Sequence, residues 1–96
     1  MTFLVKVRNT VIHFINSVLE KSQRIITEAL ARLEDDPFPG SGGNKERINL
    51  RKGREVYRMH IARKFTVFYS VDLPNKIVRV HEILTIEQAH KKYGRL

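Results

Sequence analysis

Two short segments of this sequence each carry an arginine and a histidine two residues apart. Arg58 and His60 alternate with apolar residues in VYRMHI. Arg79 and His81 do the same in KIVRVHEIL. Residues two apart project from the same face of a β-strand, so each segment places a cation beside an imidazole. An imidazole can accept or donate a proton near neutral pH, and a neighbouring cation on an open sheet face suits it to chemistry on a phosphate group.

The stretch from Val56 to Asp72 has the alternation of a β-hairpin. Its apolar residues recur at every second position, and β-branched and aromatic residues, which favour strands, are frequent. Residues 62–64 interrupt the pattern between the two strands. Arg58 and His60 are predicted to lie on an open face. The opposite face is predicted to be core and carries Tyr57, Met59, Ile61, Val67, Tyr69 and Val71.

A first strand and two helices are predicted before this hairpin. Phe3 to Arg8 alternates apolar and polar residues, which indicates a strand. Two stretches between Val11 and Leu33 then have apolar residues at helical spacing. Asn9 or Thr10 is predicted to cap the first helix and Ser22 the second, through their side-chain oxygens. Joined by only two or three residues, the helices must run antiparallel as a helical hairpin.

A connector, a strand and a short helix account for the remaining segments. Residues 35–37 are expected to end the second helix, and residues 38–43 are rich in Pro, Gly and Ser. Phe38 at their start is expected to tuck back against the helices. The basic stretch 44–54 is predicted to be a turn that leads into the hairpin. Lys76 to Leu84 indicates a last strand, and Ile86 to Tyr93 indicates a short helix.

These elements predict an α+β fold in the order β-α-α-β-β-β with a short C-terminal helix, as a single domain spanning residues 1–96. The helical hairpin is expected to cover one face of a small, mainly antiparallel sheet, with the other face partly open. His81 and Glu82 are neighbours and would point to opposite faces of a regular strand. A bulge near Glu82 would change that arrangement.

The charge of the chain favours a polyanionic partner. Lys and Arg number 18 against 10 acidic residues, which gives a formal net charge of +8 and a pI near 10.2. A balance this basic in a compact domain is typical of nucleic-acid binding. The alternative is a solvated basic surface that only keeps the protein in solution.

The sequence also argues against several other kinds of site. It has no cysteine, which excludes disulfides, thiolate nucleophiles and cysteine zinc sites. Its four histidines lack the spacing of metal ligands, so no metal and no other cofactor is expected. His13, among apolar residues on the first helix, is expected to be structural. No segment is apolar enough to span a bilayer or to act as a secretory signal, so a cytoplasmic protein without a membrane partner is expected.

Several motifs, in their order and spacing, resemble the RelE/ParE superfamily of toxins from bacterial and archaeal toxin–antitoxin pairs. They are LRKG at 50–53, YRMHI at 57–61, VFYSVD at 67–72, KIVRVHEIL at 76–84 and a tyrosine near the C-terminus. The resemblance covers nearly the whole chain and implies the superfamily fold. It also implies one of two activities. RelE-like members cut messenger RNA in the ribosomal A site by activating a ribose 2′-hydroxyl to attack the adjacent phosphate, whereas ParE-like members inhibit DNA gyrase.

The resemblance implies roles for individual residues. Arg58 and His60 stand where the nucleases carry basic residues on the open face, and the histidine can serve as base or acid. Tyr93 matches the C-terminal tyrosine, which can stack on a base or donate to the leaving group. These three are the expected catalytic residues. The expected nucleic-acid-binding residues are Arg51, Lys52, Arg54, Arg79, His81, His90 and Lys91.

Two positions depart from the nuclease pattern. An arginine at the start of the third family strand aligns with Thr66, and an arginine before the tyrosine aligns near Glu87. Neither replacement can neutralise a phosphate, although basic residues lie nearby in the sequence. The leading interpretation is a ribosome-dependent endoribonuclease that inhibits translation. A ParE-like gyrase inhibitor and a noncatalytic basic binding module stay open.

The same resemblance implies the partners of the protein. A cognate antitoxin is expected whichever activity holds. Messenger RNA on the ribosome is the expected target of the nuclease, and DNA gyrase is the target in the alternative. Codon preference and oligomeric state are not specified by the sequence.

Overall fold

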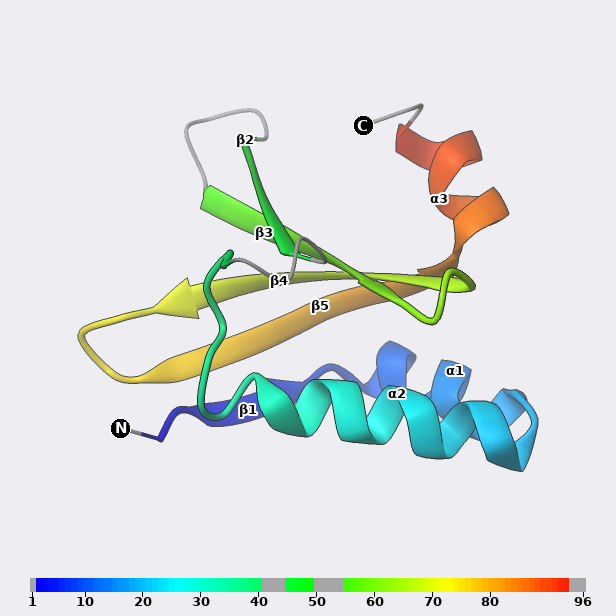
Figure 1. Ribbon diagram of the computed structural model, residues 1–96, viewed down its shortest axis with the longest axis horizontal. Coiled ribbons are helices and arrows are strands. Elements are labelled where there is room, and N and C mark those ends of the chain that lie inside the picture. The colour runs from blue at the N-terminus through cyan, green and yellow to red at the C-terminus, as the bar shows by residue number, and fades with distance from the viewer. Residues whose placement is uncertain (1, 41–44, 50–54, 94–96) are drawn as a thin grey trace.

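The computed structural model describes residues 2–40, 45–49 and 55–93, and the side chains of Asn49, Glu55 and Tyr93 are not among the described groups. The helices α1, α2 and α3 and the strands β1 to β5 follow one another along the chain (Figure 1). Their bounds are β1 Leu4–Val7, α1 Asn9–Ser17, α2 Glu20–Arg32, β2 Lys45–Asn49, β3 Glu55–Ile61, β4 Phe65–Asp72, β5 Ile77–Thr85 and α3 Ile86–Tyr93. The predicted α+β class is confirmed, with one strand more than the sequence indicated.

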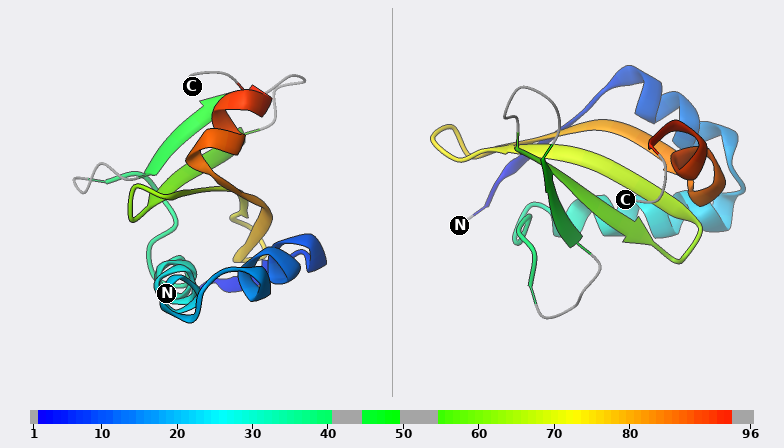
Figure 2. Two further views of the ribbon diagram at one scale, coloured as in Figure 1. Left: turned by 90° about the vertical axis from the view of Figure 1, so that its right-hand side faces the viewer. Right: turned by 90° about the horizontal axis from the view of Figure 1, so that it is seen from above.

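The five strands form one mostly antiparallel sheet in the order β1-β5-β4-β3-β2. Only the pairing of β1 with β5 is parallel. Helices α1 and α2 cover one face of this sheet, and α3 stands on the opposite face (Figures 1 and 2). The predicted helical hairpin on one face is therefore confirmed, and its two helices are joined through Val18 and Leu19 alone.

In the described residues no helix is both long and apolar enough to cross a membrane.

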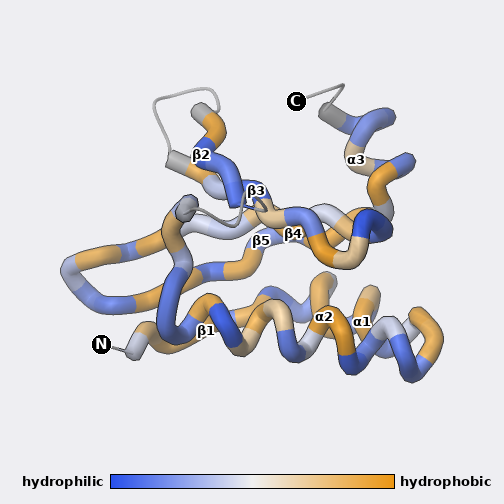
Figure 3. The backbone as a smooth tube through the Cα atoms, in the orientation of Figure 1, coloured by the Kyte–Doolittle hydropathy of each residue, from blue (hydrophilic) through white to orange (hydrophobic). Residues whose placement is uncertain are grey.

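The core lies between the sheet and the two helices. The residues predicted to face inward on the central hairpin are buried there, except Val71, which is partly buried, and Val67 and Tyr69 are completely enclosed. Val78 and Val80 of β5 join them, as the alternation of the last strand predicted. From the helices the core receives Val11, Ile26, Ala29, Leu30 and Leu33. Apolar and polar residues accordingly alternate along α1 and α2, as expected of helices with one buried side (Figure 3).

Strand β2 is absent from the predicted order. The segment KERIN was interpreted as part of a basic turn, because charged residues fill it and Ile48 alone is strongly apolar. In the structure it pairs antiparallel with β3, with Glu46 opposite Arg58. As the last strand of the sheet order it has a neighbour on one side only. Such an edge strand can form with polar side chains, so it leaves little hydrophobic signal.

The predicted helix caps are wrong. Helix α1 follows Arg8 and α2 follows Leu19, and neither N-terminus has a side-chain cap. Asn9, Thr10 and Ser22 lie inside the first turns instead. The short connection explains the second error, because only Val18, which packs against the core, and Leu19 separate the two helices.

The last antiparallel pair contains the bulge that the sequence allowed near Glu82. Phe68 of β4 pairs with Glu82, whereas the next residue, Tyr69, pairs with Val80. His81 is therefore the extra residue on β5. Its ring lies within 2.7 Å of the Ser70 hydroxyl, on the face away from α1 and α2.

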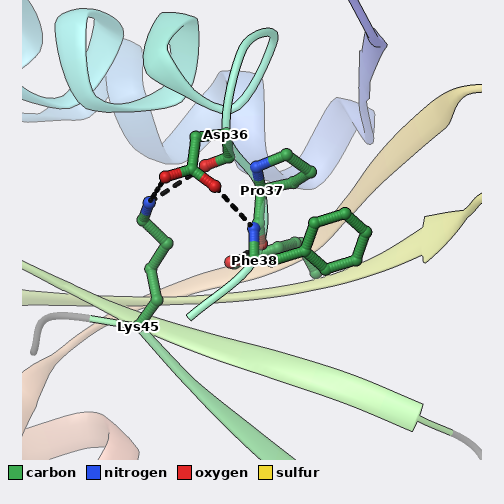
Figure 4. Close-up of polar contacts among 5 residues, drawn as sticks. Asp36, Pro37, Phe38 and Lys45 are labelled. Carbon is green, nitrogen blue, oxygen red and sulfur yellow. Dashed lines mark hydrogen bonds and ion pairs between the residues drawn. The ribbon is translucent and has the colours of Figure 1, made fainter. Parts of the chain in front are cut away.

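The connector after α2 is fastened to the sheet. Lys45 of β2 donates to the carbonyl oxygen of Asp36 at 2.9 Å and forms an ion pair with its carboxylate at 3.7 Å (Figure 4). Phe38 makes edge-to-face contacts with Phe3 and Tyr57. Phe38 is half-buried against the core that the helices and the sheet share, and its ring contacts come from the residue before β1 and from β3.

Removing the hydroxyl of Tyr69 should destabilise the protein. The buried hydroxyl donates to the carbonyl oxygen of Pro37 at 2.6 Å, and burial raises the pKa of this phenol far above its ordinary value. Tyr69→Phe leaves that carbonyl without its donor, so the free energy of unfolding should fall by about 1 to 3 kcal/mol in urea titration. Tyr57→Phe is the matched control, because Tyr57 stacks on Tyr69 but its hydroxyl has no hydrogen bond among the described residues. Equal losses in the two variants would contradict the role of the Pro37 bond.

Candidate functional site

Arg58 lies on the sheet face opposite α1 and α2, as predicted, but it is not an exposed cation. Its side chain is only 8% exposed and is paired with the carboxylate of Glu46, which is 51% exposed. The partners face each other across β2 and β3. The Nε atom of Arg58 is buried and has no hydrogen-bond partner within the described residues. An arginine in this state is held in a fixed position.

His60 follows Arg58 on the same face and is held by Thr66. The Nδ1 atom of the imidazole lies 3.3 Å from the Thr66 hydroxyl, across the pair of strands β3 and β4. If Nδ1 carries the proton and donates to that oxygen, Nε2 is left as the proton acceptor of the ring. Thr66 itself is buried, so its hydroxyl is a fixed partner.

The surroundings of His60 favour its neutral form. Partial burial lowers the pKa of the imidazole below 6.5, and the charges of Arg58 and His90 lower it further. Glu46 acts in the opposite direction and raises it, without reversing the shift. At neutral pH the ring is thus predominantly uncharged. A neutral imidazole can act as a general base.

Helix α3 stands over this face and adds further predicted residues. His90 and Lys91 are exposed on it, and the charge of His90 reaches His60. Lys92 of the same helix is paired with Glu82 of β5 at 2.6 Å. Tyr93 is the last residue of α3, and the role predicted for its side chain lies outside the described groups. Arg51, Lys52 and Arg54 also lie outside the described residues.

The second predicted pair lies at another part of the same face. Arg79 is exposed and pairs in register with Ser70 of β4 and with Lys6 of β1. With His81, Lys6 and Arg8 it lines a hollow of about 220 Å³ whose floor includes Val7 and Val80. We call this the basic hollow. The Arg58 and Arg79 pairs are thus separate sites along one face, and they do not converge.

Sequence reasoning missed four residues of these sites. Glu46 was missed with its strand, and Thr66 was noted only as the loss of an arginine. Lys6 and Arg8 were assigned to the polar side of the first strand without any role. Their alternation with Val5 and Val7 was the available signal, but nothing local indicated that β1 would lie parallel to β5. Glu87, the second departure, is exposed in the first turn of α3.

Proton transfer is the chemistry available to one group of side chains on this face, formed by Arg58, His60, Thr66 and Glu46. We call it the histidine cluster. It offers a proton acceptor, a residue that orients it and a buried cation two residues away along the strand. Proton removal next to a group of negative charge is the chemistry that such an arrangement supports.

No protein-family model and no curated protein matches the sequence. Solved structures match over most of the chain. One is the archaeal RelE–RelB complex from Pyrococcus horikoshii OT3, with 22% identity and a TM-score of 0.75 over 88% of this chain and 96% of that one. Another is the toxin–antitoxin complex RelBE2 from Mycobacterium tuberculosis, with 10% identity and a TM-score of 0.72 over 88% and 99%. A free double-arginine mutant of the E. coli toxin RelE has 12% identity and a TM-score of 0.58 over 94% and 90%.

These similarities show the fold. The chain has the fold of RelE toxins, and the resemblance inferred from its motifs is confirmed at that level. The similar structures named here are RelE toxins or their antitoxin complexes, so they lend no support to the ParE-like alternative.

Proposed function

We propose that this protein is the toxin of a toxin–antitoxin pair and an endoribonuclease that cuts messenger RNA on the ribosome. The observation that carries the proposal is the histidine cluster on a RelE fold. Within it, His60 has a lowered pKa, a fixed hydroxyl partner and a buried arginine on the same face. The net charge of +8 suits a polyanionic substrate.

In the proposed reaction His60 is the general base. Its Nε2 takes the proton of a ribose 2′-hydroxyl, and the 2′-oxygen attacks the adjacent phosphorus. The bond from phosphorus to the 5′-oxygen of the next nucleotide breaks, and that oxygen takes up a proton. The products are a 2′,3′-cyclic phosphate and a 5′-hydroxyl. Tyr93 is the proposed donor to the leaving oxygen, as the family resemblance implies.

Arg58 is proposed to stabilise the negative charge that grows on the phosphate. Burial and the ion pair with Glu46 hold its guanidinium in a fixed position on the same face as His60. Glu46 now holds the terminal nitrogen of the same guanidinium. Because half of the Glu46 side chain is exposed, an incoming phosphate can take its place at this nitrogen while the carboxylate turns to water.

An antitoxin is the proposed partner in the resting cell. The similar structures from Pyrococcus horikoshii and Mycobacterium tuberculosis are complexes of a toxin with its antitoxin. An acidic segment on such a partner would match the charge of this chain. A gene next to this one that encodes no small acidic or DNA-binding protein would count against the pairing.

Inducible expression in a surrogate host tests the proposed function. Translation should stop within minutes, and primer extension should find cuts inside translated messages. The variant that combines Arg58→Ala with His60→Ala should abolish both effects. His13→Ala is the control, because His13 is exposed on α1, at odds with the structural role predicted for it, and α1 lies across the sheet from the cluster. Growth arrest with intact messages and DNA damage signalling would indicate gyrase inhibition and contradict the nuclease proposal.

Removing the Thr66 hydroxyl should impair catalysis without unfolding the protein. Thr66→Val keeps the side-chain shape but deletes the partner of His60 Nδ1, so the base loses its fixed orientation. A misplaced catalytic group costs up to about 100-fold in rate. We expect a fall of that order in the cleavage rate on ribosomes. The midpoint of the acid side of its pH profile, which reports the pKa of His60, should also shift. Thr66→Ser, which restores a hydroxyl, should recover both. An unchanged pH profile in the valine variant would show that Thr66 only fills space.

A further inference from the structure

The basic hollow concentrates positive charge that the proposed reaction does not use. Lys6, Arg8 and Arg79 line it together with His81, over a floor that includes Val7 and Val80. Its volume of about 220 Å³ is several times the roughly 30 Å³ that a water molecule occupies in the liquid. It therefore has room for a group larger than one water molecule, and its polar walls are all basic.

The sheet topology builds this hollow. The parallel pairing of β1 with β5 sets Lys6 directly beside Arg79. Arg8 follows two residues later on β1's polar side, as the residue that precedes α1. His81, two residues after Arg79, lies on the same face, where its Nε2 is 2.7 Å from the Ser70 hydroxyl. Two pairs of basic residues from opposite ends of the sequence, Lys6 with Arg8 and Arg79 with His81, thus meet on one short length of sheet.

The charges in the hollow are not neutralised from within the described part of the chain. No ion pair there joins Lys6, Arg8 or Arg79 to a carboxylate. The nearest acid on β5, Glu82, is already paired with Lys92. Asp72 of β4 feels the charge of Arg79 only weakly, after its own hydrogen bonds to Asn75. An anion bound in the hollow would be attracted by all of these like charges at once.

We propose that the basic hollow binds a phosphate group of the RNA backbone, apart from the scissile phosphate at the histidine cluster. This inference rests on the proposed function and extends its substrate contacts. Along the face, Arg79 lies two strands from Arg58 and Lys6 lies three, which corresponds to roughly 10–15 Å at the usual strand spacing. A short stretch of single-stranded backbone can span that distance. The hollow would then fix the path of the strand, whereas the histidine cluster carries out the cut.

The experiment measures binding without cleavage. A fluorescent single-stranded 2′-O-methyl RNA oligonucleotide lacks the attacking hydroxyl, and its affinity is measured over a range of salt concentrations. The variant that combines Lys6→Gln with Arg8→Gln should weaken binding and reduce the slope of log affinity against log salt by about one, because one phosphate contact is lost. The matched control combines Lys21→Gln with Arg24→Gln, which removes the same charge from the exposed face of α2 across the sheet. This control should leave the slope near that of the unmodified protein.

A second arm uses inorganic phosphate as the probe, with NMR signals of His81 and Arg79 as the readout. Chemical-shift changes that saturate in the unmodified protein and vanish in the Lys6/Arg8 variant support the site. Phosphate binding without any change in RNA affinity would show a small-anion site and overturn the RNA assignment. Equal loss of RNA affinity in both double variants would show a diffuse charge effect and also overturn it. Normal RNA binding through the hollow in a protein that cuts no message would instead contradict the nuclease proposal alone.

Discussion

Replacing His60 with alanine should lower the rate of message cleavage on purified ribosomes by about 10²- to 10⁴-fold, the contribution expected of a general base. The reason is that this imidazole combines a lowered pKa with a fixed partner at Nδ1. The measurement is a single-turnover rate with saturating toxin, so that weaker binding does not enter. His90→Ala should have a smaller effect, because His90 acts on His60 only through its charge.

The pH dependence of the same cleavage rate tests the pKa of His60 as the general base. Burial, Arg58 and His90 all hold its pKa below 6.5, so the active neutral form persists as the pH falls through that value. The rate at pH 6.5 should therefore exceed half of its plateau value, and the His60→Ala variant should lack this acid limb. A midpoint above 6.5 would mean that Glu46, the one group that raises the pKa, dominates, and it would contradict the arrangement described.

Replacing Ile26 with alanine should have the second large effect, this time on stability. Ile26 lies in the middle of α2, is completely buried and belongs to the core beneath the sheet. Truncating a buried isoleucine leaves a cavity and costs about 2 to 5 kcal/mol. We expect a loss of that size in the free energy of unfolding, which is a large share of the total for a domain of this size.

The control for this change is Ile12→Ala on α1. Ile12 is 44% exposed and lies outside the core cluster, so its truncation should cost no more than about 1 kcal/mol. Chemical denaturation of both variants provides the comparison. Similar losses at the two positions would mean that the helical hairpin does not pack on the sheet through the face described here.

The fold was largely predictable because its signals are local. Two-residue alternation placed Tyr57, Met59 and Val67 in the core and put Arg58 and His60 on the other face, and all of these placements are confirmed. Burial of one face fixes strand register, since a slip by one residue would reverse every side chain. The edge strand β2 escaped detection because no second sheet neighbour demands apolar residues there. The helix caps were wrong because tertiary packing, rather than a capping side chain, sets where α1 and α2 begin.

The candidate site was less predictable because its contacts join distant parts of the chain. The type of residue at position 58 indicated a cation, but its pairing with Glu46 depends on an unpredicted strand. In the sequence, Thr66 was noted only because it replaces an arginine of the family, whereas in the structure its hydroxyl contacts the imidazole of His60. The basic hollow depends on the parallel pairing of the first and last strands, which are about as far apart in sequence as two strands of this chain can be. Of these features, only a bulge near Glu82 had been foreseen as a possibility.

The central claim is that this protein cuts RNA by activating a ribose 2′-hydroxyl. The most direct measurement uses a ribosome-bound message with a single 2′-deoxynucleotide on the 5′ side of the mapped cut. The account predicts that the cut at that position disappears, whereas the all-ribose message is cut and ends in a 2′,3′-cyclic phosphate. Cleavage of the deoxy-substituted message at the same position and rate would contradict it.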